Sequence, residues 1–237
     1  MRFGPKSCGS GNGLNLGSGY FVGGRELRLV QSHRDLGVTV DQTLKFHIHI
    51  NIIVGKASGL ANQLLRGTVC RSREFMVTLF VSHIRPILEY CSTVWNLGYL
   101  GDARKLEGVQ RRWSREVVGM EGLNYLERLK ELRLFSICGR MLRTDLIKVW
   151  KIFHADVDVG LDSIFERNSH SATRGHSFKL SVPRCRSELR RRYFNVRCVQ
   201  VWNNLPEVAV SLDSVASFKR YLDGHLGHLF FQLVEGA

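Results

Sequence analysis

The sequence predicts a mainly α protein, in which a short N-terminal β-hairpin precedes a helical bundle and a small α/β C-terminal extension follows it. Apolar residues recur every three or four positions through residues 43–155, which places them on one stripe of each helix. Residues 24–42 show a strand-like pattern instead. A polar stretch at 166–177 marks a boundary in the C-terminal part. With 44% hydrophobic residues over 237 positions, the chain can build an ordinary core.

Two different patterns precede the helical region. Residues 1–23 are rich in glycine, which costs chain entropy and buries little surface, so we expect a flexible leader. Residues 24–42 contain Leu27 and Leu29 and then the apolar run 36–40. This spacing predicts a short β-hairpin whose first strand includes the two leucines.

Five helices are predicted between residues 43 and 155, with short loops between them. The first is amphipathic and ends near Gly67. The second covers residues 72–95 and should bend at Pro86, because the proline ring opposes the carbonyl of Ser82. Helices in sequence with short connections indicate a bundle.

Capping residues indicate where the other three helices of the bundle begin. Asp102 is a candidate N-cap of the third helix. Asn124 and Glu127 have the spacing of a capping box at the start of the fourth. The fifth follows Ser136 and places Asp145 on its inward stripe. A buried carboxylate needs a partner, and we expect an arginine.

The C-terminal part, residues 156–227, mixes strand and helix patterns. Residues 178–182 alternate like a strand, and residues 193–202 are expected to be helical. Ser214 is a candidate N-cap of a last helix. Residues 228–237 are expected to form a loose tail.

The charge balance favours an anionic partner. Lys and Arg number 34 against 21 Asp and Glu, which gives a formal net charge of +13. An excess of this size favours a polyanion, with nucleic acid as the first candidate and an anionic membrane surface as the second. The chain has no run of about 18 apolar residues, so we expect no membrane-spanning helix.

Cysteine usage and the N-terminus bear on the compartment. The 6 cysteines include no CxxC pair, which favours free thiols in a reducing compartment. The first residues lead into glycine and serine with no apolar segment of a signal peptide. We therefore expect an intracellular protein, nuclear or cytoplasmic, that is not secreted.

Several short segments resemble one known family, the polymerase polyprotein of jockey-like, non-long-terminal-repeat retrotransposons. The resemblance covers about residues 24–226, and its segments follow the family's order and spacing. These segments are 35–38 (DLGV), 44–46 (LKF), 49–50 (HI), 81–90 (VSHIRPILEY), 94–95 (VW), 106–113 (LEGVQRRW), 125–129 (YLERL), 143–147 (RTDLI), 173–176 (TRGH), 202–206 (WNNLP) and 218–219 (FK).

The resemblance implies the rear part of a reverse transcriptase, downstream of its catalytic centre. In such enzymes a hairpin after the palm forms the primer grip, and a helical thumb follows it. By resemblance, Leu36, Gly37 and Val38 belong to a primer-grip-like hairpin over residues 24–42. The bundle at 43–155 would be thumb-like, and the family's thumb packs against the template-primer duplex.

The sequence departs from the family at the catalytic centre. The family's palm carries two adjacent aspartates that bind divalent ions, and this sequence contains no adjacent pair of aspartates. Two-metal phosphoryl transfer needs carboxylates that converge on both ions. We therefore expect a non-catalytic fragment, with no metal, no cofactor and no small-molecule substrate.

Two basic clusters are the candidate contacts to RNA, DNA or an RNA–DNA hybrid. Guanidinium groups pair with phosphates, and neighbouring aromatic rings can stack on bases. The alternative is a solvated face whose aromatic side chains point into the core, which we prefer for Trp113. The first cluster consists of Arg111, Arg112 and Arg115, and the second of Arg184, Arg186, Arg190, Arg191, Arg192, Tyr193, Phe194 and Arg197.

Two other functions stay open beside nucleic-acid binding. A helical protein-interaction module could use the same basic surface to recruit acidic partners, and an active polymerase would need a palm from another chain. Histidines give little support to a metal site, because His47 and His49 point to different faces of a helix. The oligomeric state is left open.

Overall fold

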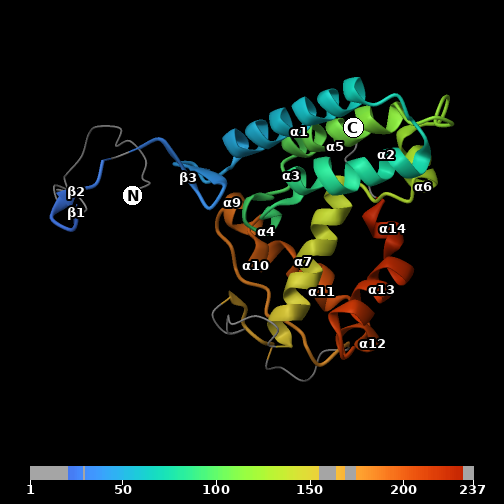
Figure 1. Ribbon diagram of the computed structural model, residues 1–237. Coiled ribbons are helices and arrows are strands. Elements are labelled where there is room, and N and C mark those ends of the chain that lie inside the picture. Colours follow the sequence, from blue (N-terminus) through green and yellow to red (C-terminus); the bar gives the residue numbers. More distant parts are fainter. Residues whose placement is uncertain (1–20, 29, 155–163, 169–174, 232–237) are drawn as a thin grey trace.

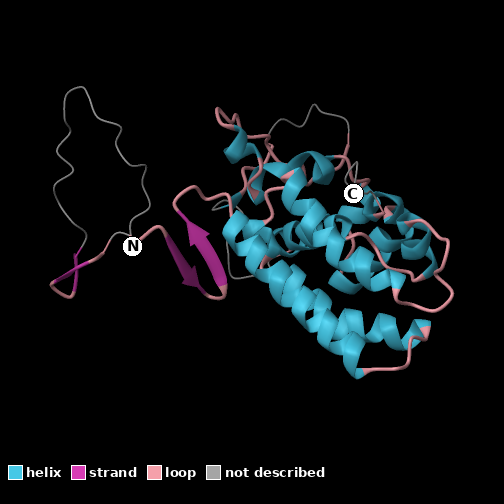
Figure 2. Cartoon of the chain, turned by 90° about the horizontal axis from the view of Figure 1, so that it is seen from above, coloured by secondary structure: helices cyan, strands magenta, loops and turns pink. Residues whose placement is uncertain are grey.

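The computed structural model of the protein describes residues 21–28, 30–154, 164–168 and 175–231. Helices dominate these residues, and two short antiparallel hairpins precede them (Figure 1). Figure 2 shows the strands to one side of the helical body. The predicted fold class, mainly α with a short N-terminal hairpin, is confirmed.

The longer hairpin joins β3 (Ser32–Asp35) to β4 (Val38–Asp41). Its two-residue turn consists of Leu36, with φ 43°, and Gly37, with φ 87°. Both values lie in the left-handed region, as a type I′ hairpin turn requires. Such a tight turn fixes the register, so the first strand is the four residues directly before it. The prediction that Leu27 belongs to this strand is wrong.

The shorter hairpin pairs β1 (Phe21–Val22) with β2 (Arg25–Glu26). Its first strand falls within residues 1–23, so the end of the predicted flexible leader has regular structure. The rest of that leader, residues 1–20, lies outside the described residues, as does Leu29.

Most helices of the first group lie in the upper part of the molecule in Figure 1, with α4 lower, beside α10 (Phe194–Arg197). The long helix α1 lies along α5 and also contacts α3. The members of this group are α1 (His47–Gly67), α2 (Arg73–Leu79), α3 (Arg85–Glu89), α4 (Ser92–Trp95), α5 (Leu100–Arg115) and α6 (Tyr125–Glu131).

The predicted helix at 72–95 is interrupted twice. A π-helical turn, η1 (Phe80–Ile84), separates α2 from α3, and the amide of Arg85 donates to the carbonyl of Phe80 within it. This wider turn precedes Pro86, which has no amide hydrogen of its own to donate. Cys91, with φ 57°, then ends the run before α4. The helical stripe survives, because Phe80, Ile84 and Leu88 are all buried.

Of the N-caps predicted for the bundle helices, two are formed and one is not. The N-cap of α5 is Tyr99, so the prediction for Asp102 is wrong. Asp102 lies in the first turn, where a carboxylate is also favoured, and its Oδ2 is 2.5 Å from Nδ1 of His47. Asn124 and Glu127 form the predicted capping box of α6. Ser136 caps the next helix by accepting a hydrogen bond from the amide of Gly139 at 2.9 Å.

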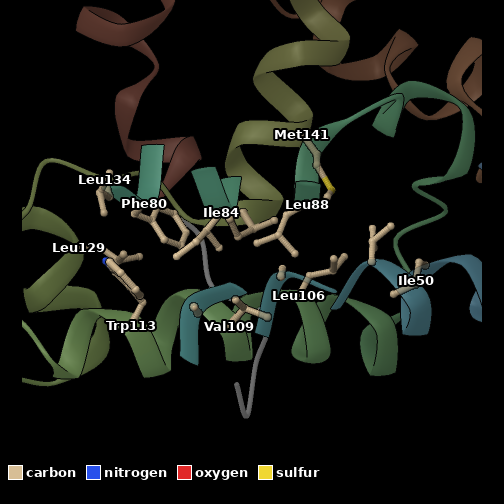
Figure 3. Close-up of a cluster of buried hydrophobic side chains, with 14 of the residues drawn as sticks. Ile50, Phe80, Ile84, Leu88, Leu106, Val109, Trp113, Leu129, Leu134 and Met141 are labelled. Carbon is tan, nitrogen blue, oxygen red and sulfur yellow. The ribbon is translucent and has the colours of Figure 1, made fainter. Parts of the chain in front are cut away.

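The helix α7 (Ile137–Phe153) is shared by two hydrophobic cores. Its first turns carry Ile137 and Met141 into a core that also contains Phe80 and Trp113 (Figure 3). Its later turns carry residues such as Trp150 into the second core. In Figure 1 this yellow helix runs from the upper helices down into the C-terminal ones.

Glu107 anchors the start of α7 to α5. Its carboxylate is fully buried and accepts hydrogen bonds from the Tyr125 hydroxyl at 2.6 Å and the Cys138 amide at 3.0 Å. Burial raises the pKa of Glu107, while the bonds from Tyr125 and from the amides of Ile137 and Cys138 oppose that rise. Burial and the nearby carboxylate raise the pKa of the Cys138 thiol to about 12.

The C-terminal helices pack around the second half of α7. They are α9 (Glu188–Arg191), α10 (Phe194–Arg197), α11 (Val199–Asn203), α12 (Glu207–Val210), α13 (Val215–His225) and α14 (Gly227–Phe230). The predicted helix at 193–202 is split into α10 and α11. Ser214 caps α13 as predicted, because its Oγ accepts a hydrogen bond from the Ser217 amide at 3.1 Å.

Two predictions for the C-terminal part are wrong. Residues 178–182 form no strand but one isolated bridge, between Arg167 and Leu180, because only this position has a paired neighbour among the described residues. The predicted loose tail at 228–237 begins inside α14, and Phe230 of that helix is fully buried. The Phe230 carbonyl accepts hydrogen bonds from the amide and the hydroxyl of Ser136, both at 3.0 Å. Residues 232–237 lie outside the described residues.

Gly139 tests this packing of the C-terminal segment. A Cβ at this position would lie 2.0 Å from the Phe230 carbonyl oxygen, so we expect Gly139→Ala to lower the free energy of unfolding by about 1–3 kcal/mol. Urea denaturation measures it. The matched control is Gly108→Ala in α5, where no atom lies within 4 Å of the new Cβ. That change should stabilise by up to about 1 kcal/mol. Equal stability of the Gly139→Ala variant and the unmodified protein would contradict the packing.

Glu107 should give the stability a distinctive pH dependence. Because its pKa is raised on folding, its stabilising contribution is fully present below the unfolded pKa, about 4.3, and is lost as pH rises through the folded value. Glu107→Gln removes this titration. We expect the variant to become more stable relative to the unmodified protein as pH rises from acid to neutral, in urea denaturation at a series of pH values. A stability difference that does not change with pH would refute the shift.

Candidate nucleic-acid interface

The second basic cluster lies on α9, α10 and the chain leading into them. Ser187 caps α9 by accepting a hydrogen bond from the Arg190 amide at 3.2 Å. The structure divides the six arginines of this cluster by their exposure. Four of them are exposed, and these are Arg184, Arg186, Arg190 and Arg191.

Arg197 is held inside the protein by Asp145. Its Nε and Nη2 donate to the two carboxylate oxygens at 2.8 and 3.0 Å, and Nη2 also donates to the Thr93 carbonyl at 3.1 Å. Burial raises the pKa of Asp145, and the Arg197 guanidinium opposes that rise. The predicted arginine partner of Asp145 is therefore confirmed. Arg197 joins α7, α10 and the segment of α4, which leaves it no free donor face for a phosphate.

The guanidinium of Arg192 is also engaged in contacts within the protein. Its Nη1 donates to the carbonyls of Leu97 and Gly98, each at 3.1 Å, and its guanidinium lies 4.6 Å from the ring centre of Tyr99. An ion pair with Glu188 at 3.0 Å completes its contacts. Arg192 therefore ties the C-terminal part to the segment between α4 and α5.

Tyr193 and Phe194 are half-buried and pack against different cores. Tyr193 packs against the first core, and Arg190 lies 5.9 Å from the centre of its ring. Phe194 packs against the second core and meets Phe165 edge to face at 5.4 Å. These contacts favour a packing role over base stacking for Phe194, and Tyr193 is likewise only half-exposed.

The first basic cluster lies on α5, whose two sides differ sharply in charge. Trp113 is buried and its Nε1 donates to the Met76 carbonyl at 3.1 Å, so it belongs to the core, as we preferred. Arg111 is half-buried and lies 4.9 Å from the ring centre of Tyr125. Arg112 and Arg115 are exposed.

The sequence reasoning missed two further cations of this face, Arg104 and Lys105, which are also exposed. With 3.6 residues per turn, positions 104, 105, 108, 111, 112 and 115 fall within about 120° of the helix circumference. Both acids of the helix, Asp102 and Glu107, are buried, although Asp102 Oδ1 still lies 3.7 Å from the Lys105 ammonium. The spacing of 104, 108, 112 and 115 could have revealed this face. We call Arg104, Lys105, Arg112 and Arg115 the α5 basic face.

The primer-grip-like residues lie at the tip of the β3–β4 hairpin. Leu36 is 84% exposed, whereas Val38 is buried. The Tyr90 hydroxyl donates to the Leu36 carbonyl at 3.1 Å, and a Cβ on Gly37 would lie 3.2 Å from the Tyr90 ring. The hairpin tip is therefore held against the end of α3, and only glycine fits at position 37 without strain.

Comparisons with known proteins give no relative. A scan against protein-family models, a search of curated proteins and a search of solved structures each found no match. Across the described parts of the chain, no helix is both long and apolar enough to cross a bilayer. Within the same residues, no group of three or more His, Cys, Asp or Glu side chains could hold a metal ion. Five cysteines there are free thiols.

Removing Arg197 should destabilise the fold, whereas removing a neighbouring surface arginine should not. Arg197→Gln leaves the Asp145 carboxylate buried without its counter-ion, so we expect a loss of about 3–5 kcal/mol in the free energy of unfolding. Arg191→Gln, the matched control on an exposed side chain, should change it by less than about 0.5 kcal/mol. Urea denaturation distinguishes the two.

The double variant Asp145→Asn with Arg197→Gln separates the charge from the packing. It should recover part of the loss, because no ionised group is then left without a partner. If Arg197→Gln were as stable as Arg191→Gln, Arg197 would be a surface side chain and would return to the candidate interface.

Proposed function

We propose that the protein is a non-catalytic, nucleic-acid-binding fragment derived from the rear part of a jockey-like retrotransposon reverse transcriptase. Its ligands would be RNA, DNA or an RNA–DNA hybrid. The resemblance of its sequence segments supports this origin, and a short hairpin followed by a helical bundle is the arrangement that this origin leads one to expect. No catalytic step is assigned, because the sequence has no adjacent aspartates.

The observation that carries the proposal is the α5 basic face. The helix buries Asp102 and Glu107 and leaves five cations on its outer side, with Gly101 and Gly108 between them. Arg112 and Arg115 have no ion-pair partner among the described residues, so their donors can reach a phosphate. A run of guanidinium groups without intervening acids is the electrostatic pattern of a nucleic-acid backbone site.

The exposed arginines beside α9 provide a second candidate surface. Arg184 and Arg186 have no ion-pair partner among the described residues, while Arg191 has a long contact of 3.4 Å to Glu188. Exposed pairs of this kind are worth little, so Arg191 can exchange its partner for a phosphate.

One observation favours the alternative, a helical protein-interaction module. Ile48 and Ile52 lie one turn apart on α1 and are 46% and 40% exposed. Exposed apolar side chains on one helix face suit contact with a protein, though this pair is small for an interface. A protein partner would use this apolar pair, and nucleic acid would not.

The salt dependence of binding to a primer-template duplex tests the two basic surfaces. Each phosphate neutralised should steepen the slope of log K against log salt by roughly 0.7–0.9. Changing Arg186, Arg190 and Arg191 together to Gln should flatten the slope by about two to three units if all three contact phosphate. Changing Arg112 and Arg115 together to Gln should flatten it by about one and a half units.

The matched control removes two exposed arginines elsewhere, Arg66 at the end of α1 and Arg220 on α13. This double Gln variant lowers the net charge as much as the α5 variant does but should leave the slope near its original value. Fluorescence anisotropy over a salt series measures each slope. If all three variants flatten it equally, binding is non-specific charge attraction. If the unmodified protein does not bind at all, the protein-interaction alternative is favoured.

A further inference from the structure

An open pocket of about 500 Å³ lies where the β3–β4 hairpin meets the side of α1 and the end of α3. Figure 1 shows the hairpin beside the N-terminal end of α1. The lining includes three nitrogen-bearing polar side chains together with Ile53, Ile87 and Tyr90. The polar ones are Arg34, His49 and Lys56.

The charge in this pocket is positive and uncompensated. Arg34 and Lys56 are exposed, and neither has an ion-pair partner among the described residues. None of the residues that line the pocket is a carboxylate. Burial lowers the pKa of His49, and repulsion from Lys56 and Arg34 lowers it further, so both cations act on the same place.

His49 adds a hydrogen-bond donor without a partner. Its side chain is 2% exposed, and its Nδ1 accepts a hydrogen bond from the Thr39 amide at 3.2 Å. In the neutral ring this bond leaves the hydrogen on Nε2. Nε2 has no hydrogen-bond partner among the residues that the structure describes. A buried donor without an acceptor costs free energy, which a ligand oxygen would recover.

We propose that this pocket binds a phosphate monoester. Two cations match the two charges of that group, the His49 imidazole supplies a neutral donor, and Tyr90 and Ile87 offer an apolar wall to the organic part of the ester. The volume exceeds what a bare phosphate ion occupies. A small phosphomonoester has this chemistry without any nucleic acid. The proposal for the pocket and the proposal for the arginine surfaces can therefore be tested separately.

The test follows the His49 imidazole in the full-length protein, labelled with ¹⁵N-histidine, by two-bond ¹H–¹⁵N NMR. Ribose 5-phosphate is titrated at constant ionic strength against chloride. The His49 signal should shift and saturate, while that of the exposed His83 should stay in place. Arg34→Gln and Lys56→Gln should each weaken binding by about tenfold, the effect of losing one charge-assisted hydrogen bond. Arg66→Gln, on the same helix as Lys56 but outside the pocket, should bind normally.

Three other outcomes overturn the assignment. An unmoved His49 signal, or equal binding by the Lys56→Gln and Arg66→Gln variants, removes the pocket as the site. An oligonucleotide without terminal phosphates provides a further comparison. If it moves the His49 signal and ribose 5-phosphate does not, the pocket contacts the nucleic-acid backbone instead. Because Arg34 and Lys56 are exposed, their variants remain informative even if a substitution of the buried His49 fails to fold. Saturable binding of ribose 5-phosphate without any binding of a duplex would support the pocket and contradict the proposed function.

Discussion

The structure depends on two buried carboxylates that fix α7, the helix shared by both cores. Glu107 reaches from α5 to the amides at the start of α7, and Asp145 holds Arg197 beside its middle. Apolar packing is non-directional, so by itself it leaves the rotation and the axial position of α7 loosely specified. Hydrogen-bonded carboxylates set both, because a buried charge that loses its partners is costly. The C-terminal helices then pack on a helix whose position is already defined.

The burial of acidic side chains also determines the charge of the outer surface. Asp102, Glu107 and Asp145 are all buried, while Arg104, Arg112 and Arg115 on α5 are exposed. Burial of these acids leaves parts of the exterior more basic than the net charge of +13 suggests. The α5 basic face is the clearest result. It arises because both acids of the helix are buried, Glu107 with Tyr125 and Asp102 beneath His47 and Lys105.

The sequence predicted structural features that depend on residues close together in the chain. It did not predict features that depend on contacts between distant segments. The capping box at Asn124, the caps at Ser136 and Ser214 and the inward turn of Asp145 each follow from spacing within one helix. Phe230 was predicted to lie in a loose tail, because nothing near it in sequence shows that its carbonyl meets Ser136, 94 residues earlier. Arg192 and Arg197 looked like surface arginines for the same reason, since their partners come from distant segments.

The pocket beside the hairpin is also formed by contacts between distant segments, and it is the site of the proposed phosphate binding. His47 and His49 were expected to point to different faces of one helix, and they do, since His47 pairs with Asp102 and His49 meets Thr39. What the sequence could not show is that the type I′ turn brings Arg34 to the same place as Lys56. The helix α1 contains no acidic residue, so nothing on it can neutralise these cations. A folded protein keeps like charges together only at a cost in electrostatic free energy, and an anion bound between them removes that cost.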